Sequence, residues 1–176
     1  FGQPEWSTRY VTVADLNGDS RPDLIVANRS SAPDNPRPSF VCLNDGKGAF
    51  PTFRPLPTQS ATIIIASDLD GDGCIDLYVP HRDSGQSLIF WNDGTGTFSA
   101  QPASLGPPHS SIRAAAAVDI DGDGKKDIVV GDAGEGVFVY LNSGKRKFAE
   151  PMPLGSKPGA PYSIGVADLN RDGKLD

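Results

Sequence analysis

A nine-residue acidic motif at residues 68–76, DLDGDGCID, constrains this chain more than any other feature of its sequence. It places carboxylates at positions 1, 3, 5 and 9 and glycines at positions 4 and 6. Alternate acidic residues on a tightly turning backbone converge on one point, where their like charges repel strongly. A hard cation bound through oxygen relieves this repulsion. Ca²⁺, which accepts about 6–8 oxygen ligands in flexible geometry, fits better than Mg²⁺ with its stricter octahedron.

The motif occurs four times, in loop 1 (15–23), loop 2 (68–76), loop 3 (119–127) and loop 4 (168–176). The predicted side-chain ligands are Asp15, Asn17, Asp19 and Asp23, then Asp68, Asp70, Asp72 and Asp76, then Asp119, Asp121, Asp123 and Asp127, and finally Asp168, Asn170, Asp172 and Asp176. The backbone carbonyl at position 7 is a further predicted ligand, at Arg21, Cys74, Lys125 and Lys174. We therefore predict up to four Ca²⁺ ions, one in each loop.

An EF-hand loop opens in the same way, but it needs a bidentate Glu at position 12 and a helix on each side. Position 12 is Val26, Val79 or Val130 in the first three copies, and the flanking residues are apolar and β-branched. The EF-hand interpretation fails on both counts. The sequence predicts strand–loop–strand calcium loops instead.

The charge of the chain comes mostly from these loops, which hold 14 of its 22 acidic residues. The net charge is −6 and would become +2 with four bound Ca²⁺ ions, so nucleic acid and anionic membranes are disfavoured as partners. No apolar run approaches the roughly 18 residues of a membrane span. Because loops of this kind bind calcium usefully at millimolar concentrations, we expect a secreted or cell-surface location, with the periplasm as an alternative.

Repeats organise the whole chain, which is predicted to be a single region over 1–176. The first ligands of successive loops are 53, 51 and 49 residues apart, and a second landmark, Asn-Asp-Gly or Asn-Ser-Gly followed by Phe, recurs with the same period. Periods of about 20–50 residues indicate solenoids, propellers or arrays. The predicted repeats are 1–49, 50–97, 98–147 and a partial repeat at 148–176.

Each repeat contains the apolar runs of four strands. The first strand is predicted at 10–14, 63–67, 114–118 and 164–167, the second at 24–27, 77–79 and 128–130, and the third at 40–43, 88–91 and 137–141. A short fourth strand is predicted near Phe50, Phe98 and Phe148, with prolines following it. Since proline lacks the N–H that a sheet ladder needs, this strand is expected at the outer edge.

Four antiparallel strands in about 50 residues, repeated and apolar on both faces, indicate an all-β chain built of β-propeller blades. The first strand would line the central axis and the fourth the rim, with the calcium loops at one end of the ring. A stack of hairpins in a β-solenoid is the alternative, although solenoid repeats are usually shorter.

The stretches DLNGDSRPDLIV, DLDGDGCIDLYV, DIDGDGKKDIVV and DLNRDGKLD, with their N-D-G-x-G-x-F tails, resemble FG-GAP (VCBS) repeats. These are the integrin-alpha-like calcium-binding propeller blades. The resemblance covers essentially the whole chain and implies a commonly seven-bladed propeller, of which about 3.5 blades are present. Ser20 in place of the loop glycine and Pro22 before the last ligand make loop 1 unusual. Asn17 and Asn170 lower the charge of their loops.

Three complete repeats and a fraction of a fourth would leave apolar blade faces and strand edges uncovered. We therefore expect the chain to self-associate or to be completed by the rest of a longer chain. Cys42 and Cys74 are interpreted as two small half-buried residues, with a mutual disulfide as the less favoured alternative.

The sequence shows no convincing catalytic set, because two histidines and three glutamates remain outside the cation loops. We predict a non-catalytic, calcium-binding module for extracellular adhesion or binding of a carbohydrate or protein ligand. An accessory propeller of a secreted polysaccharide-active enzyme and a structural spacer are the alternatives. Aromatic and arginine residues lie just before the predicted first strands. Packing where the chain enters each blade explains them more simply than ligand binding does. The candidate ligand-binding residues among them are Trp6, Arg9, His109, Arg113 and Tyr162.

Overall fold

The computed structural model describes residues 6–30, 37–83, 85–155 and 159–176 and is built from β-strands. The strands are β1 (Thr8–Ala14), β2 (Asp23–Asn28), β3 (Ser39–Leu43), β4 (Thr52–Leu56), β5 (Ile65–Ser67), β6 (Asp76–Val79), β7 (Gly85–Phe90), β8 (Ala103–Ser110), β9 (Ile112–Val118), β10 (Asp127–Asp132), β11 (Gly136–Tyr140), β12 (Asn142–Gly144), β13 (Lys147–Phe148) and β14 (Met152–Leu154). The described residues include no helix that could span a membrane.

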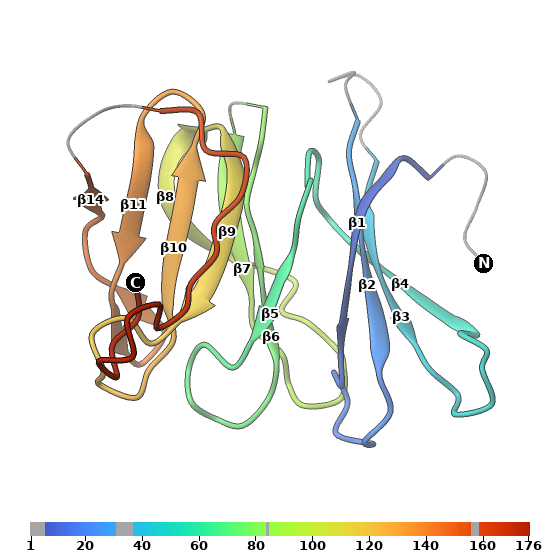
Figure 1. Cartoon of the computed structure of the whole chain (residues 1–176). Coiled ribbons are helices and arrows are strands. Elements are labelled where there is room, and N and C mark those ends of the chain that lie inside the picture. Colours follow the sequence, from blue (N-terminus) through green and yellow to red (C-terminus); the bar gives the residue numbers. More distant parts are fainter. Residues whose placement is uncertain (1–5, 31–36, 84, 156–158) are drawn as a thin grey trace.

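The strands form three four-stranded antiparallel sheets, which we name blade 1 (β1-β2-β3-β4), blade 2 (β5-β6-β7-β8) and blade 3 (β9-β10-β11-β14). Within each blade, neighbouring strands follow one another along the chain, apart from the small β12-β13 hairpin that precedes β14. The blades stand side by side, as Figure 1 shows. This arrangement confirms a β-propeller architecture.

The first strands of the blades lie next to one another on the inner side. β5 contacts both β1 and β9, and the Thr12 hydroxyl in β1 donates a hydrogen bond of 2.6 Å to the carbonyl of Ile64, next to β5. Small residues, such as the Ala114–Ala117 run in β9, allow this close approach of backbones. The predicted place of the first strand at the axis is therefore confirmed.

Two hydrophobic cores fill the spaces between blades. Strand side chains alternate between faces, so Leu77 and Val79 of β6 join the core against blade 1, whereas Tyr78 joins the core against blade 3. The second strands are almost entirely buried. Each lies between two strands of its own sheet, and side chains cover both faces of that sheet. Burying a large apolar side chain contributes about 1.5–3 kcal/mol, so each blade is stabilised mainly by its neighbours.

The fourth strand is the outer strand of every blade, as predicted, but it begins later than the sequence suggested. β4, β8 and β14 start two, five and four residues after the landmark phenylalanine, and Pro55 and Pro153 lie inside the strands rather than after them. The reason is that the phenylalanine belongs to the preceding turn, where Phe98 pairs with Asn92 and Phe148 with Asn142. An edge strand tolerates proline because one of its sides has no ladder partner.

Each blade takes its outer strand from the start of the next sequence repeat. β4 follows Phe50, β8 follows Phe98 and β14 follows Phe148, although each pairs with the third strand of the preceding repeat. The first residues of the partial fourth repeat therefore complete blade 3. The described residues thus contain three four-stranded blades.

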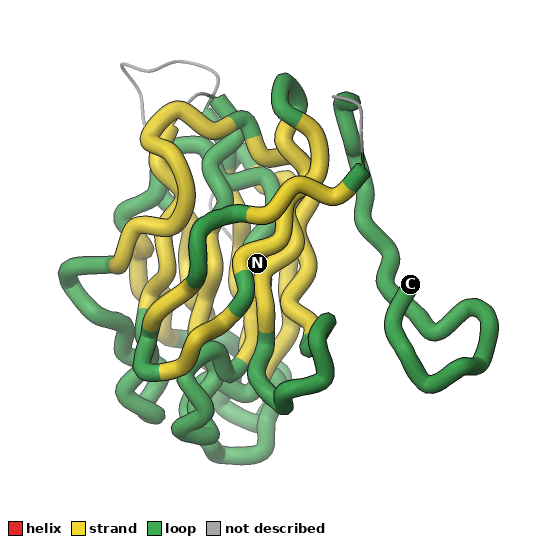
Figure 2. The backbone as a smooth tube through the Cα atoms, turned by 90° about the vertical axis from the view of Figure 1, so that its left-hand side faces the viewer, coloured by secondary structure: helices red, strands yellow, loops and turns green. Residues whose placement is uncertain are grey.

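The strand predicted at 164–167 is wrong, because residues 159–167 form no regular strand. A strand needs a hydrogen-bonded neighbour, and no described strand pairs with this stretch. The segment instead leads to loop 4, which is closed by a 2.9 Å bond from the Asp176 N–H to the Ala167 carbonyl. In Figure 2 this C-terminal stretch is drawn as loop, set apart from the strands.

The two cysteines are free thiols, so the disulfide alternative is wrong. Cys42 is fully buried in β3, rather than half-buried as expected, and Cys74 is partly buried in loop 2. Burial raises the pKa of the Cys42 thiol to about 12, because a thiolate has no compensating charge in that apolar surrounding. Cys42 is therefore a packing residue.

Candidate functional site

Loops 1, 2 and 3 connect the first strand of each blade to the second, and they lie at one end of the blades, along the lower edge of Figure 1. Their backbones share one geometry, with positive φ at positions 4 and 6. This conformation suits glycine, which occupies both positions in loops 2 and 3. Ser20 (φ 63°) and Arg171 (φ 65°) adopt it without being glycine. The repeated motif therefore encodes a repeated backbone turn.

The first aspartate of each loop organises that turn. The Asp68 carboxylate accepts hydrogen bonds from the N–H groups of Gly71 (2.8 Å) and Gly73 (3.0 Å). Asp119 does the same in loop 3, with 2.8 and 2.9 Å to the glycines at positions 4 and 6. Aspartate favours such local bonds to its own backbone, so position 1 both shapes the loop and faces its centre.

In loops 1, 2 and 3 the ninth residue is a buried aspartate that ties the loop to the turn after the third strand. One oxygen of Asp127 accepts the Ile120 N–H at 2.9 Å, and the other accepts the Asn142 N–H at 2.7 Å. Asp23 and Asp76 make the equivalent pairs of bonds. These three carboxylates are at most 1% exposed. Position 9 is therefore a structural anchor as well as a predicted ligand.

In loops 2 and 3 the carboxylates at positions 1, 3 and 9 converge. Asp68, Asp70 and Asp76 offer oxygens that all lie within 4.8 Å of one another, and the same holds for Asp119, Asp121 and Asp127. Three converging carboxylates present the hard oxygen donors that Ca²⁺ prefers. Burial, together with the charges of Asp70 and Asp72, raises the pKa of Asp76 to about 6. A bound cation would relieve this electrostatic cost, so the donor set fits calcium.

The position-5 aspartates do not belong to these convergent groups. Asp72 accepts the Cys74 N–H at 2.8 Å, and this bond is the largest cause that lowers its pKa. Asp123 accepts the N–H of Lys125 at 2.9 Å, and the Lys125 ammonium also contacts this carboxylate. The prediction gave position 7 a role only through its carbonyl. The structure shows that its N–H, and in loop 3 its side chain, hold the position-5 carboxylate.

Loops 1 and 4 differ because an asparagine occupies position 3. The Asn17 amide donates a 2.9 Å hydrogen bond to Asp19, and the Asn170 amide donates one of 3.3 Å to Asp172. In both loops the amide oxygen accepts the N–H of the position-5 aspartate, at 3.2 Å in loop 1 and 2.9 Å in loop 4. Arg21 adds a 2.6 Å ion pair to Asp19. Loops 1 and 4 therefore offer fewer charges to a cation than loops 2 and 3.

Loop 3 allows the ligand assignment to be tested residue by residue. We expect Asp123→Ala to reduce the number of bound Ca²⁺ ions by one, because each loop supplies its own ligands. We expect Lys125→Ala to leave that number unchanged and the affinity within about twofold, since an exposed ion pair contributes little. Isothermal titration of both variants with CaCl₂ measures this. An equal loss in the two variants would show that the assignment is wrong.

Arg146 is a site residue that the sequence analysis missed. It lies in the β12-β13 turn of blade 3, with φ at 62°, and its Nε donates a 2.6 Å hydrogen bond to Asp70 in loop 2. Its guanidinium also lies over the Trp91 ring, 4.9 Å from the centroid. Since Asp70 and Arg146 are 76 residues apart, no local sequence signal pairs them. Arg146 thus places a fixed positive charge beside loop 2.

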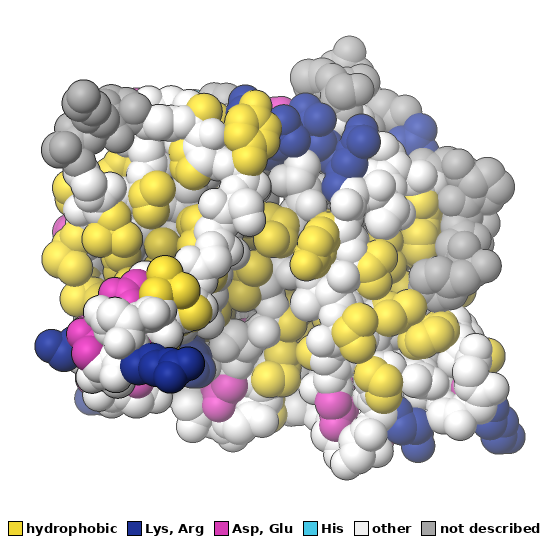
Figure 3. Space-filling model, in the orientation of Figure 1, with side chains coloured by type: hydrophobic (Ala, Val, Ile, Leu, Met, Phe, Trp, Pro, Cys, Tyr) yellow, Lys and Arg dark blue, Asp and Glu magenta, His cyan; other side chains and the backbone are white. Residues whose placement is uncertain are grey.

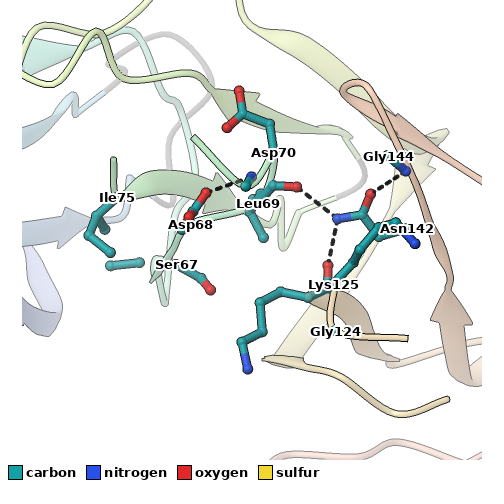
Figure 4. Close-up of a pocket in the computed structure, with 12 residues that line it drawn as sticks. Ser67, Asp68, Leu69, Asp70, Ile75, Gly124, Lys125, Asn142 and Gly144 are labelled. Atoms are coloured by element: carbon teal, nitrogen blue, oxygen red, sulfur yellow. Dashed lines mark hydrogen bonds between the residues drawn. The ribbon is translucent and has the colours of Figure 1, made fainter. Parts of the chain in front are cut away.

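Two asparagines of the turn landmark connect successive loops, which the sequence analysis also missed. The Asn142 amide donates to the Lys126 carbonyl in its own blade at 3.0 Å and to the Leu69 carbonyl in loop 2 at 2.7 Å. Figure 4 shows Asn142 between the two loops, beside a cavity of about 400 Å³. Asn92 makes the same link to Leu16 in loop 1, at 2.8 Å. The signal available in the sequence was the recurrence of this asparagine in every landmark.

The five candidate ligand-binding residues do not form one site. The Arg113 guanidinium lies over the Tyr162 ring, with its Cζ 4.5 Å from the centroid. Trp6 instead stacks on Phe40, with 4.5 Å between ring centroids, in blade 1. Arg9 is exposed in β1, and His109 lines a separate cavity of about 330 Å³ between blades 2 and 3. Of the five, the structure brings only Arg113 and Tyr162 together.

Comparisons with known proteins agree with this geometry. The chain is 29% identical over 170 residues to mouse cartilage acidic protein 1, covering 90% of this chain and 25% of that protein. It is 32% identical over 130 residues to mouse integrin alpha-3, covering 64% of this chain and 12% of that protein. The chain thus spans a quarter or less of these relatives.

A solved structure of similar fold comes from work on the recognition of non-reducing terminal N-acetylglucosamine by an Agrocybe aegerita lectin. It aligns with 97% of this chain and 46% of its own, at a TM-score of 0.62 and 20% identity. Residues 15–79, 68–130 and 119–176 each match the FG-GAP-like repeat, and every match begins at the first aspartate of a loop. The chain therefore belongs to the FG-GAP-like repeat family.

Proposed function

We propose that this chain is a calcium-stabilised, non-catalytic propeller module that binds a carbohydrate or protein ligand outside the cell. The convergence of three carboxylates in each of loops 2 and 3 carries the proposal. These clusters lie at the same positions of a repeated turn, and their donor chemistry favours Ca²⁺. When bound, the ion neutralises the clustered carboxylates, while the loop residues fix the connection between the first and second strands.

The extracellular setting follows from the affinity expected of such loops. Extracellular calcium modules bind with dissociation constants of about 10⁻⁴–10⁻³ M, which suits millimolar calcium outside cells. Similarity to integrin alpha-3 supports the same assignment. His81 and His109 line different cavities, so these two histidines do not share one site.

Ligand binding is supported by the fold shared with a lectin that recognises N-acetylglucosamine. A cavity lined by Arg113 and Tyr162 is a place where a ligand could bind. We expect the calcium-loaded protein to bind a subset of glycans on an array, and we expect excess EGTA to abolish this binding by loosening the blades. Denatured protein on the same array is the control. An array with no signal in calcium, together with no retention of extracellular-matrix proteins, would contradict the proposal.

We also propose that the outward faces of blades 1 and 3 contact further blades of the same kind. Val11 and Val13 in β1 are 43% and 58% exposed, and Met152 and Leu154 in β14 are each 46% exposed. The large share of the relatives that lies outside the aligned region is consistent with such blades. We expect the 176-residue polypeptide alone to self-associate in light scattering. A monodisperse monomer with every loop calcium-loaded would contradict this.

A further inference from the structure

The inner sides of the three blades line an open cavity of about 480 Å³, formed by β1, β5 and the stretch entering it, β9 and the segment after Gly159. Its lining includes Tyr10, Thr62, Arg113 and Tyr162. Since the first strands run toward the calcium loops, the residues that precede them lie at the end of the blades away from these loops. Figure 3 shows Lys and Arg side chains gathered at the upper edge, away from the loops. We name this space the axial cavity.

The axial cavity contains two donors without partners. The Arg113 Nε and the Thr62 Oγ1 are shielded from solvent, and neither has a hydrogen-bond partner among the described residues. Buried polar groups are nearly always paired, and an unpaired one destabilises the arrangement that contains it. Two such atoms, brought to one cavity from different blades, indicate a site that a ligand completes.

The charge of the cavity selects an anion. Arg113 makes no ion pair with any described residue, and no aspartate or glutamate lines the axial cavity. The Arg113 guanidinium lies over the uncharged π face of Tyr162, which is a weak partner for a cation. A carboxylate matches the fork of N–H donors on arginine. A phosphate would bring about two negative charges against a single cation, so a carboxylate fits better.

The tyrosines select the rest of the ligand. Tyr10 is 51% exposed and Tyr162 is 71% exposed, and both rings line the axial cavity. Each offers an apolar face with a polar tip, which suits the C–H face and hydroxyl groups of a sugar ring. Resting on the proposed ligand-binding function, we propose that the axial cavity binds an acidic saccharide, with Arg113 and Thr62 taking its carboxylate and Tyr162 stacking on its ring. Because the Arg113 Nε is shielded from solvent, this binding mode requires the guanidinium to turn beneath Tyr162.

Calorimetric titration of the calcium-loaded protein with methyl β-D-glucuronide and with methyl β-D-glucoside tests this. The two probes differ only in the carboxylate. We expect the glucuronide to bind at least tenfold more tightly than the glucoside. We expect Arg113→Gln to reduce glucuronide binding at least tenfold, to the level of the glucoside, and Thr62→Val, which removes only the hydroxyl, to reduce it severalfold. These changes in affinity are the size expected when a charge-assisted hydrogen bond is lost.

The control is Lys47→Gln, which removes an exposed cationic side chain that does not line the axial cavity. It should change glucuronide binding by less than twofold. Unchanged calcium-dependent melting of Arg113→Gln shows that the variant is folded. Equal binding of both sugars, or an unaffected Arg113→Gln, overturns the proposal. Arg113-dependent binding of an aspartate-containing peptide without glucuronide binding also overturns it, in favour of an acidic protein ligand. Array binding confined to neutral glycans overturns the axial site while the proposed function stands.

Discussion

Chelation of calcium is expected to lower the melting temperature of this protein by about 10 °C or more. At about 1 mM Ca²⁺ and a dissociation constant of about 10⁻⁴ M, each occupied loop contributes about 1.4 kcal/mol to the free energy of unfolding. Three loops contribute about 4 kcal/mol and all four about 5–6 kcal/mol, against about 5–15 kcal/mol for a whole domain. For a chain of this size, 1 kcal/mol shifts the melting temperature by about 2–4 °C.

Calorimetric melting in 1 mM CaCl₂ and in excess EGTA measures this effect. Replacing the calcium with Mg²⁺ at equal ionic strength is the control, and it should restore little of the stability because Mg²⁺ retains its water and demands stricter geometry. The same melting temperature with and without EGTA would rule out a structural role for the loops.

Asp127→Ala is expected to be the most damaging single substitution in loop 3. It removes a predicted ligand and also leaves the buried N–H of Asn142 and the partly buried N–H of Ile120 without their acceptor. A buried unsatisfied donor costs about 1–3 kcal/mol, so we expect a loss of about 2–5 kcal/mol even in EGTA. Urea unfolding in EGTA isolates this structural contribution from that of the ion.

Asp123→Ala is the matched control, because Asp123 belongs to the same loop but is exposed and pairs with Lys125 at the surface. In EGTA it should change the free energy of unfolding by less than about 0.5 kcal/mol. If the two variants lost the same stability in EGTA, Asp127 would not be the anchor that its hydrogen bonds indicate.

The repeated elements of this fold were predictable from the sequence, because each is encoded locally. The apolar runs specify the first three strands of each blade, and the motif specifies a turn whose glycines adopt positive φ at positions 4 and 6. The stretch 164–167 shows the limit of such reasoning. It has the composition of a first strand, yet strand formation depends on a hydrogen-bonded neighbour.

The features that were missed depend on contacts between blades. Arg146 reaches Asp70 across 76 residues, and Asn142 reaches Leu69 across 73. Neither pairing leaves a periodic pattern within one repeat. The position-5 aspartates were expected to act like the other ligands, but their bonds to the position-7 N–H groups depend on the detailed path of the turn. Local patterns thus predict the blades, and tertiary structure decides how the blades are joined.

The asparagine links give the assembly of this protein a direction. Loop 1 acquires its bond to Asn92, and loop 2 its bond to Asn142, only after the third strand of the following blade has been synthesised and folded. A calcium loop emerging from the ribosome is therefore less ordered, and holds its ion less tightly, until the next blade arrives. Calcium would fill the sites in the order of the chain. Each ion would become tightly bound about one repeat after its loop has been synthesised.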